Sequence, residues 1–123
     1  MARDVSNFIR ISIPVSVLRT EPVHEAVKTL TAAAGGGTSW SADGAWFDSE
    51  DNLHSESVRV FVWNFHTDDY GKVDAAARQL VERLFEAGEK AVLKERNYDL
   101  GIAERARTVP GYAARMLFAP TKH

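Results

Sequence analysis

Hydrophobic and polar positions follow a two-residue period along residues 57–66, where the chain reads SVRVFVWNFH. Because successive side chains of a strand point to opposite faces, this segment predicts a β-strand with two different rows of side chains. One row holds Val58, Val60 and Val62, and the other holds Arg59, Phe61, Trp63 and Phe65. Both rows are largely apolar. The strand is therefore predicted either to lie between two layers or to offer one face to a partner or ligand.

Two segments place apolar residues at the three- and four-residue spacing of a helix. The first, residues 20–34, begins at the capping residue Thr20 and stops at Gly35, because glycine adopts left-handed conformations at little cost. The second, residues 67–87, begins with the capping pair Asp68 and Asp69. The predicted buried stripes are Val23, Val27, Leu30 and Ala34 in the first helix and Val73, Ala77, Leu80, Leu84 and Ala87 in the second.

Three more strands are predicted from alternation and from turn residues. Residues 8–14 form the first strand, with alternate isoleucines on one face. Residues 38–48 form another, interrupted by a turn or bulge at Asp43–Gly44. Residues 91–96 form the last, with Ala91 and Leu93 facing inward and Val92 as a further candidate for the inner face.

The order strand, helix, strand, strand, helix, strand predicts a ferredoxin-like fold, an α+β sandwich of an antiparallel sheet with both helices on one face. We expect residues 1–96 to form this core and residues 97–123 to form an extension that packs on the core or on a neighbouring subunit. The helices are expected to cover the isoleucine row and the row of Val58. On that interpretation the aromatic row lies on the uncovered face, beneath the extension or a second copy.

The composition fits one globular domain. The chain has 123 residues, of which 45% are hydrophobic and 26% are charged, and this length is sufficient to bury a core. It has no cysteine, which excludes disulfides, thiolate metal ligands and thiol catalysis. No apolar run has the length of a signal sequence or a membrane span, so we expect a cytoplasmic protein without a membrane partner.

Charge is distributed unevenly along the chain. The net charge of −2 argues against a polynucleotide partner, because polynucleotide binders carry a large basic surface. Residues 43–69 are rich in acidic side chains, with Arg59 as their only Lys or Arg, whereas arginines gather near the C-terminus. The simplest interpretation is a set of solvated loops and a tail whose arginines pair with acidic residues. The alternative is an acidic surface that binds a protein target.

Arg10 and Arg59 are predicted to lie beside Phe61 and Trp63 on the uncovered face. Aromatic rings stack on bases and guanidinium groups pair with phosphates, so this face is a candidate pocket for a small anionic or nucleotide-like ligand. Residues 59–65 match only part of the aromatic strand of RNA-recognition domains, which argues against RNA. Trp40 and Trp46 share one face of their strand if no bulge intervenes, and they then line the pocket.

Two other constellations are candidates for chemistry. Gly36 and Thr38 belong to a glycine-rich turn whose backbone N–H groups can cradle an anion, although the turn follows a helix and lacks the P-loop lysine. His66 lies near Asp68 and Asp69, and an imidazole with a carboxylate can act as general acid and base. No spacing of histidines predicts a metal site, and no cofactor is expected.

Four short motifs resemble those of small uncharacterised α/β families of bacteria and phages: Gly36-Gly37-Thr38, Gly44-Ala45-Trp46, Leu53 to Val60 and Glu89 to Leu93. The resemblance spans residues 8–95. It implies the same fold and imports no activity, because these families have no agreed function. Small oligomeric phage proteins that sequester nucleotide signals or block host enzymes are similar to this chain in kind.

These observations favour a homo-oligomeric binding protein over an enzyme. Its aromatic and arginine face is predicted to form a subunit interface or a pocket for a small anionic or nucleotide-like ligand, with stacking by Phe61 and Trp63 and charge recognition by Arg10 and Arg59. One alternative is a small enzyme that uses His66 with Asp68 or Asp69 as acid and base. The other is a protein inhibitor that acts through the acidic 43–69 surface.

Overall fold

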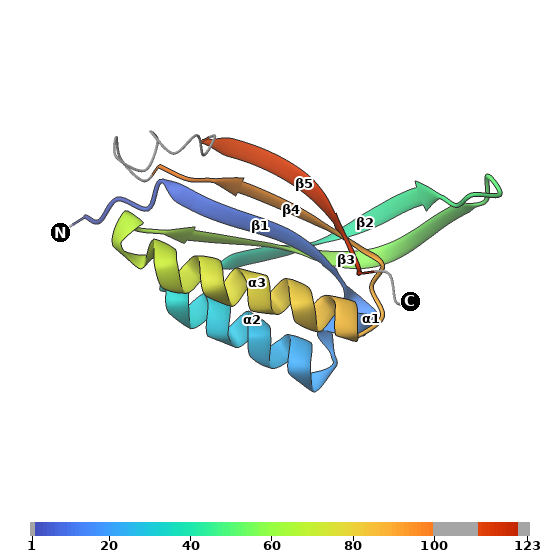
Figure 1. Cartoon of the computed structure of the whole chain (residues 1–123), viewed down its shortest axis with the longest axis horizontal. Coiled ribbons are helices and arrows are strands. Elements are labelled where there is room, and N and C mark those ends of the chain that lie inside the picture. Colours follow the sequence, from blue (N-terminus) through green and yellow to red (C-terminus); the bar gives the residue numbers. More distant parts are fainter. Residues whose placement is uncertain (1, 100–110, 121–123) are drawn as a thin grey trace.

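The computed structural model describes residues 2–99 and 111–120 of the chain. In chain order the elements are β1 (Asn7–Pro14), α1 (Val15–Leu18), α2 (Glu21–Ala34), β2 (Thr38–Phe47), β3 (Leu53–Phe65), the short 3₁₀ helix η1 (Thr67–Asp69), α3 (Tyr70–Glu86), β4 (Ala91–Asn97) and β5 (Tyr112–Phe118). In the described part of the chain, the strands form one antiparallel sheet in the order β2-β3-β1-β4-β5. The helices α2 and α3 lie side by side on one of its faces (Figure 1).

The order β2-β3-β1-β4 is that of a ferredoxin-like sheet, so the predicted α+β class and element order are confirmed. The structure adds the short α1 between β1 and α2, and it adds β5 beside β4. The β5 strand comes from the predicted extension. It adds one strand to the edge of the sheet beside β4 and does not itself lie over either face. The extension positions 100–110 and 121–123, with Leu100 and Ile102, lie outside the described residues.

The helices follow their sequence signals closely. In α2 the predicted stripe is buried, and the helix ends at Gly35, whose φ of 88° is the left-handed conformation that glycine adopts at least cost. In α3 the predicted stripe is buried up to Leu84, whereas Ala87 forms the exposed C-cap. Both helices therefore turn one apolar face towards the sheet.

The assignment of the two β3 rows was wrong, and the register of β1 against β3 shows why. Ile9 lies opposite Trp63 and Ile11 lies opposite Phe61, and residues directly opposite each other share a face of the sheet. Trp63 and Phe65 are therefore wholly buried beneath the helices, and the valine row lies on the other face. An aromatic ring buries more apolar surface than a valine side chain. This register therefore removes more apolar surface from water than one that buried the valine row.

Trp63 is held from three sides. Its indole Nε1 donates to Thr31 Oγ1 of α2 at 2.9 Å, and its ring stacks on Phe61 at 5.3 Å between centroids. The backbone of Gly37 passes close above the ring, where an added Cβ would lie 2.8 Å from Trp63 Cδ1. The glycine turn thus allows β2 to leave α2 directly over this ring.

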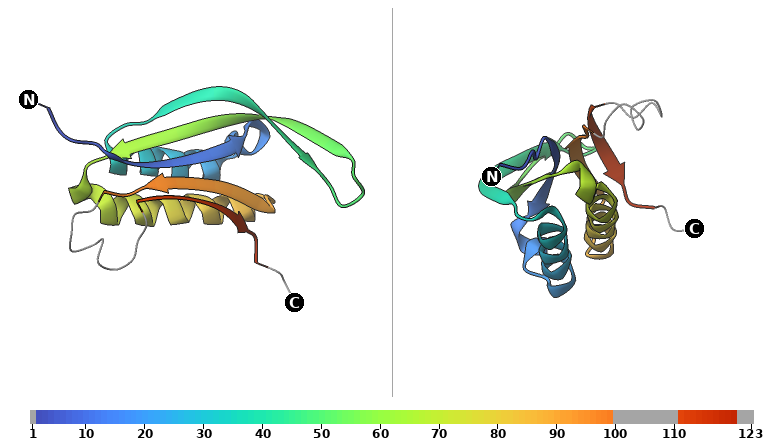
Figure 2. Two further views of the ribbon diagram at one scale, coloured as in Figure 1. Left: turned by 90° about the horizontal axis from the view of Figure 1, so that it is seen from above. Right: turned by 90° about the vertical axis from the view of Figure 1, so that its left-hand side faces the viewer.

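The predicted interruption of β2 is absent from its ladder with β3. The pairing is continuous from Thr38 with Val62 to Phe47 with Leu53, so no bulge intervenes at Asp43–Gly44. The outer half of this hairpin, residues 42–57, extends past the helices and the other strands, and we call it the arm (Figure 2). Nearly all of its residues are exposed or half-buried.

Candidate functional site

No element formed by residues 2–99 and 111–120 covers the face of the sheet opposite the helices, and we call this face the open sheet face (Figure 2). Its side chains come from all five strands, as the pairing registers show. They include Trp40 of β2, Phe8 and Arg10 of β1, Val60 and Val62 of β3, Leu93 and Glu95 of β4, and Tyr112, Met116 and Phe118 of β5. The predicted inward orientation of Ala91 and Leu93 was wrong, and the further candidate Val92 is the residue that is buried.

Large apolar side chains dominate the open sheet face. Trp40 is 44% exposed, Met116 is 50% exposed and Phe118 is 73% exposed. Exposed apolar residues scattered singly are normal, but a contiguous set marks a surface that another molecule covers. The uncovered face expected from the sequence thus exists with Phe8 and Arg10 on it, but β3 contributes its valine row in place of its aromatic row.

A polar network occupies the middle of this face. The Arg10 guanidinium contacts Glu95 Oε2 at 3.3 Å, and the Tyr112 hydroxyl donates to the same oxygen at 2.9 Å. This hydrogen bond raises the pKa of Tyr112, since it favours the protonated phenol. Arg10 Nε is buried and has no hydrogen-bond partner among the described residues. The network gives the apolar surface one fixed polar centre.

Arg10 and Arg59 do not lie together, which corrects the predicted pocket. Arg10 pairs with Val62 in the register and lies on the open sheet face, whereas Arg59 pairs with Ile13 and points to the helix side. Arg59 there donates to the hydroxyls of Ser39 at 2.9 Å and Ser41 at 3.2 Å. Trp63 is wholly buried and Phe61 packs partly buried against the core, so the exposed aromatics are those of β2 and β5.

The arm carries a compact cluster near its tip. Trp46 stacks on His54 across the ladder, with 5.2 Å between ring centroids and 16° between planes. His54 Nε2 lies 2.7 Å from Asp48 Oδ2, and Asp48 Oδ1 accepts from the N–H groups of Glu50 and Asn52 at 2.9 Å. The bond to His54, followed by the bonds from Asn52 and Glu50, lowers the pKa of Asp48 to about 2.

We expect this turn to be sensitive to acid. The pKa of Asp48 is lower in the folded arm than its ordinary 3.8, so ionised Asp48 stabilises the turn above that pH, and the stabilisation is lost as the pH falls towards 2. The Trp46 indole signal in NMR should shift over this interval. Asp48→Asn should abolish the shift while keeping an acceptor, and Asp43→Asn is the control. A shift that persists in Asp48→Asn contradicts the assignment.

Two carboxylates lie near the base of the arm. Glu56 belongs to the β3 row of the open sheet face and faces Gly44, which has no side chain to cover it. Glu89, between α3 and β4, has a raised pKa, first because of burial and then because of the negative charge of Glu56. The two carboxyl groups therefore lie close enough to repel each other. The acidic 43–69 segment indicated Glu56, but no local signal indicated Glu89.

The glycine-rich turn uses its backbone donors for the helix. The N–H groups of Gly35 and Gly36 both donate to the Thr31 carbonyl at 3.0 Å, which closes the C-terminus of α2. Gly36 and Thr38 are exposed. The predicted anion cradle at this turn stays a prediction, with two of its donors engaged.

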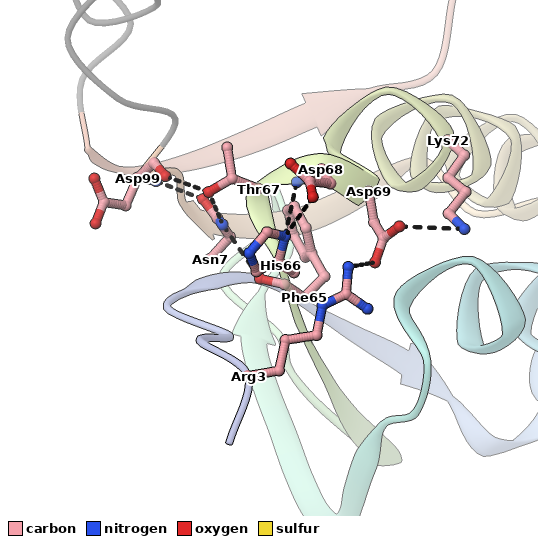
Figure 3. Close-up of polar contacts among 9 residues, drawn as sticks. All are labelled: Arg3, Asn7, Phe65, His66, Thr67, Asp68, Asp69, Lys72 and Asp99. Atoms are coloured by element: carbon pink, nitrogen blue, oxygen red, sulfur yellow. Dashed lines mark hydrogen bonds and ion pairs between the residues drawn. The ribbon is translucent and has the colours of Figure 1, made fainter. Parts of the chain in front are cut away.

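His66, Asp68 and Asp69 lie at the start of α3, where they make capping and ion-pair contacts (Figure 3). His66 Nδ1 accepts from the Asp68 N–H at 3.1 Å, and Asp69 contacts Arg3 at 3.4 Å and Lys72 at 3.2 Å. The buried Asn7 donates to the Phe65 carbonyl and the Thr67 hydroxyl, each at 3.2 Å. The contacts of Asn7 link β1 to the end of β3 and to η1. An acid–base role for His66 stays a prediction.

No membrane-spanning helix is found within residues 2–99 and 111–120, since none of the helices there has the necessary length and apolarity. The same residues contain no group of three or more His, Cys, Asp or Glu side chains arranged to hold a metal ion.

The fold and surface define a small α+β protein with an uncovered sheet face, and a phage protein shares this fold. The chain matches a phage SAM lyase in complex with S-methyl-5'-thioadenosine, with a TM-score of 0.56, 17% identity and coverage of 97% of this chain and 95% of that chain. The same lyase in its apo state gives a TM-score of 0.56 at 17% identity, over 100% and 98% of the two chains.

A lower similarity is found to the periplasmic divalent cation tolerance protein CutA from Archaeoglobus fulgidus, with a TM-score of 0.44, 13% identity and coverage of 95% and 84%. No family model and no curated protein matches the chain. The resemblance to small α/β proteins of phages is thereby confirmed at the level of the fold.

Proposed function

We propose that the chain is a self-associating protein whose open sheet face is the subunit interface, and that it binds a small ligand of the adenosine-thioether class at the base of the arm. The observation that carries this proposal is the exposed apolar surface of the open sheet face, on which Trp40, Met116 and Phe118 are each 44% exposed or more. Such a surface is stable in water when another molecule covers it.

A second copy of the chain is the occupant that the arm favours. An isolated two-stranded hairpin is marginally stable in water, and this one exposes Trp46 on one side and Phe47 and Leu53 on the other. The arm continues the open sheet face beyond the body of the molecule (Figure 2). If one copy places its arm against the open sheet face of another, both uncovered surfaces are buried together.

The ligand class is supported by the side chains at the base of the arm. A purine offers a flat π-face that stacks on an exposed aromatic ring such as that of Trp40. The sulfonium of S-adenosylmethionine carries a positive charge, which the neighbouring carboxylates of Glu56 and Glu89 attract. The neighbour of the same fold holds S-methyl-5'-thioadenosine, a thioether of this class.

Calorimetric titration with S-adenosylmethionine and with S-methyl-5'-thioadenosine tests the ligand. The wild-type chain should bind both, and Glu56→Gln should weaken binding of the sulfonium about tenfold while leaving the neutral thioether nearly unchanged, because only the sulfonium interacts with a charge. Glu82→Gln, an exposed glutamate of α3, is the matched control. Chromatography of the same mixture reports whether S-adenosylmethionine is also cleaved.

Two outcomes would contradict the ligand assignment. One is the failure of the wild-type chain to bind either compound. The other is an equal effect of Glu56→Gln and Glu82→Gln on the sulfonium, which would show that the position of the carboxylate does not matter.

A further inference from the structure

A cleft of about 380 Å³ opens on the helix side of the sheet, between α3 and the β4–β5 edge. Figure 2 shows α3 as the helix beneath this edge, with α2 beneath the other half of the sheet. Among the described residues that line the cleft, four are cationic and one is acidic: Arg78, Lys94, Arg96 and Arg115, and Asp74. The cleft is thus strongly basic in a chain whose net charge is −2.

Lys94 and Arg115 face each other directly in the β4–β5 ladder. Like charges directly opposite each other destabilise a sheet, so an unrelieved pair of this kind calls for an explanation. Within the part of the chain that the structure describes, neither side chain has a hydrogen bond or an ion pair. Nothing in this part of the protein neutralises the pair by direct contact.

The one carboxylate among the described residues that line the cleft is already engaged. Asp74 Oδ2 lies 3.1 Å from Arg78 Nε, and Asp74 Oδ1 accepts from the Tyr98 hydroxyl at 3.1 Å. Burial lowers the pKa of Lys94, and the positive charges of Arg78, Arg96 and Arg115 lower it further while Asp74 opposes them. The electrostatics and the contacts agree that the cleft has a surplus of positive charge.

We propose that this cleft binds a compact oxyanion of the phosphate class, bridged between Lys94 and Arg115. A guanidinium group offers a planar fork of donors that matches a phosphate, and an ammonium group adds a point charge beside it. The anion converts the repulsion between two opposed cations into two attractive contacts. The site lies on the opposite side of the sheet from the open sheet face, so it is a second site, additional to the proposed function.

Calorimetry and thermal unfolding with inorganic phosphate, at an ionic strength held constant with chloride, test the site. The wild-type chain should bind phosphate and melt at a higher temperature in its presence. Arg115→Gln and Lys94→Gln should each weaken binding about tenfold or more, since each removes a charged hydrogen bond. The matched controls are Arg19→Gln and Lys28→Gln, which are exposed and lie outside the cleft.

The phosphate-free proteins provide a second readout. Removal of one of two opposed cations relieves repulsion, so Arg115→Gln should melt at the same temperature as the wild-type chain or above it. A mutation that merely damaged the fold would lower the melting temperature instead. We therefore expect Arg115→Gln to melt below the wild-type chain in phosphate, and at the same temperature or above it without phosphate. This combination of melting temperatures identifies the site.

Titrations with ribose 5-phosphate and with ribose test whether the bound anion is free phosphate or the phosphate group of a metabolite. Binding of inorganic phosphate alone, or of ribose 5-phosphate as well, supports the site, and tighter binding of the sugar phosphate indicates a phosphorylated metabolite as ligand. The proposal is overturned if phosphate stabilises the wild-type chain no more than chloride does. It is also overturned if Arg19→Gln weakens binding as much as Arg115→Gln, or if ribose binds as well as ribose 5-phosphate.

Discussion

Replacement of Trp63 by alanine should destabilise the fold by about 3–5 kcal/mol, the range for removal of a large side chain from a packed core. Trp63 is wholly buried between the sheet and α2, where it stacks on Phe61 and donates to Thr31. The cavity and the lost hydrogen bond both contribute to this loss, although the Thr31 hydroxyl still donates to the Val27 carbonyl at 2.7 Å. Urea denaturation followed by circular dichroism measures it.

The matched control is Trp46→Ala, the same replacement on the exposed arm. Trp46 is 47% exposed, and its ring stacks on His54 alone among the residues that the structure describes, so its loss should cost about 1 kcal/mol or less. If Trp63→Ala does not fold, Trp63→Phe keeps most of the ring volume and should cost about 1–2 kcal/mol through the lost hydrogen bond. Equal losses for Trp63→Ala and Trp46→Ala would mean that the aromatic row of β3 does not face the helices.

Met116→Asp should reduce the assembly to a single chain. Met116 lies on the open sheet face opposite Leu93, and it is 50% exposed. A carboxylate at this position of an apolar interface has no cation to pair with directly across the ladder, and burial of an unpaired charge is strongly unfavourable. We expect self-association to weaken at least about a hundredfold, which corresponds to about 3 kcal/mol.

Light scattering across a range of protein concentrations measures this effect. Ala75→Asp introduces the same charge on the exposed side of α3, away from the open sheet face, and it should leave the assembly intact. A wild-type chain that stays monomeric at every concentration would refute the subunit interface. Dissociation by Ala75→Asp and not by Met116→Asp would place the interface on the helical layer instead.

The candidate sites differ in how far local sequence could indicate them. Trp40 and Trp46 were expected to share a face if β2 had no bulge, and the continuous ladder bears this out. The pairing of Arg10 with Glu95 and Tyr112 was not foreseen, because these residues come from three strands that are distant in the sequence. The same holds for Lys94 and Arg115, which oppose each other only because β5 pairs with β4 in this register.

The sequence by itself determined strands β1 to β4, helices α2 and α3, and the order in which they follow one another. Helices α2 and α3 lie where apolar residues recur at helical spacing, and β1 and β3 lie where they alternate, since these periods follow from the local geometry of the backbone. The end of α2 at Gly35 is also determined locally, because it depends on the positive φ that glycine adopts at little cost.

Only the tertiary structure decided which row of β3 faces the helices. Both rows are apolar, so alternation predicts two faces and gives no preference between them. The choice depends on the β1–β3 register, which places Ile9 beside Trp63, and on the space beneath α2 and α3 that the rings fill. That space is formed by residues distant in the sequence, and the surface left uncovered is therefore a property of the folded chain.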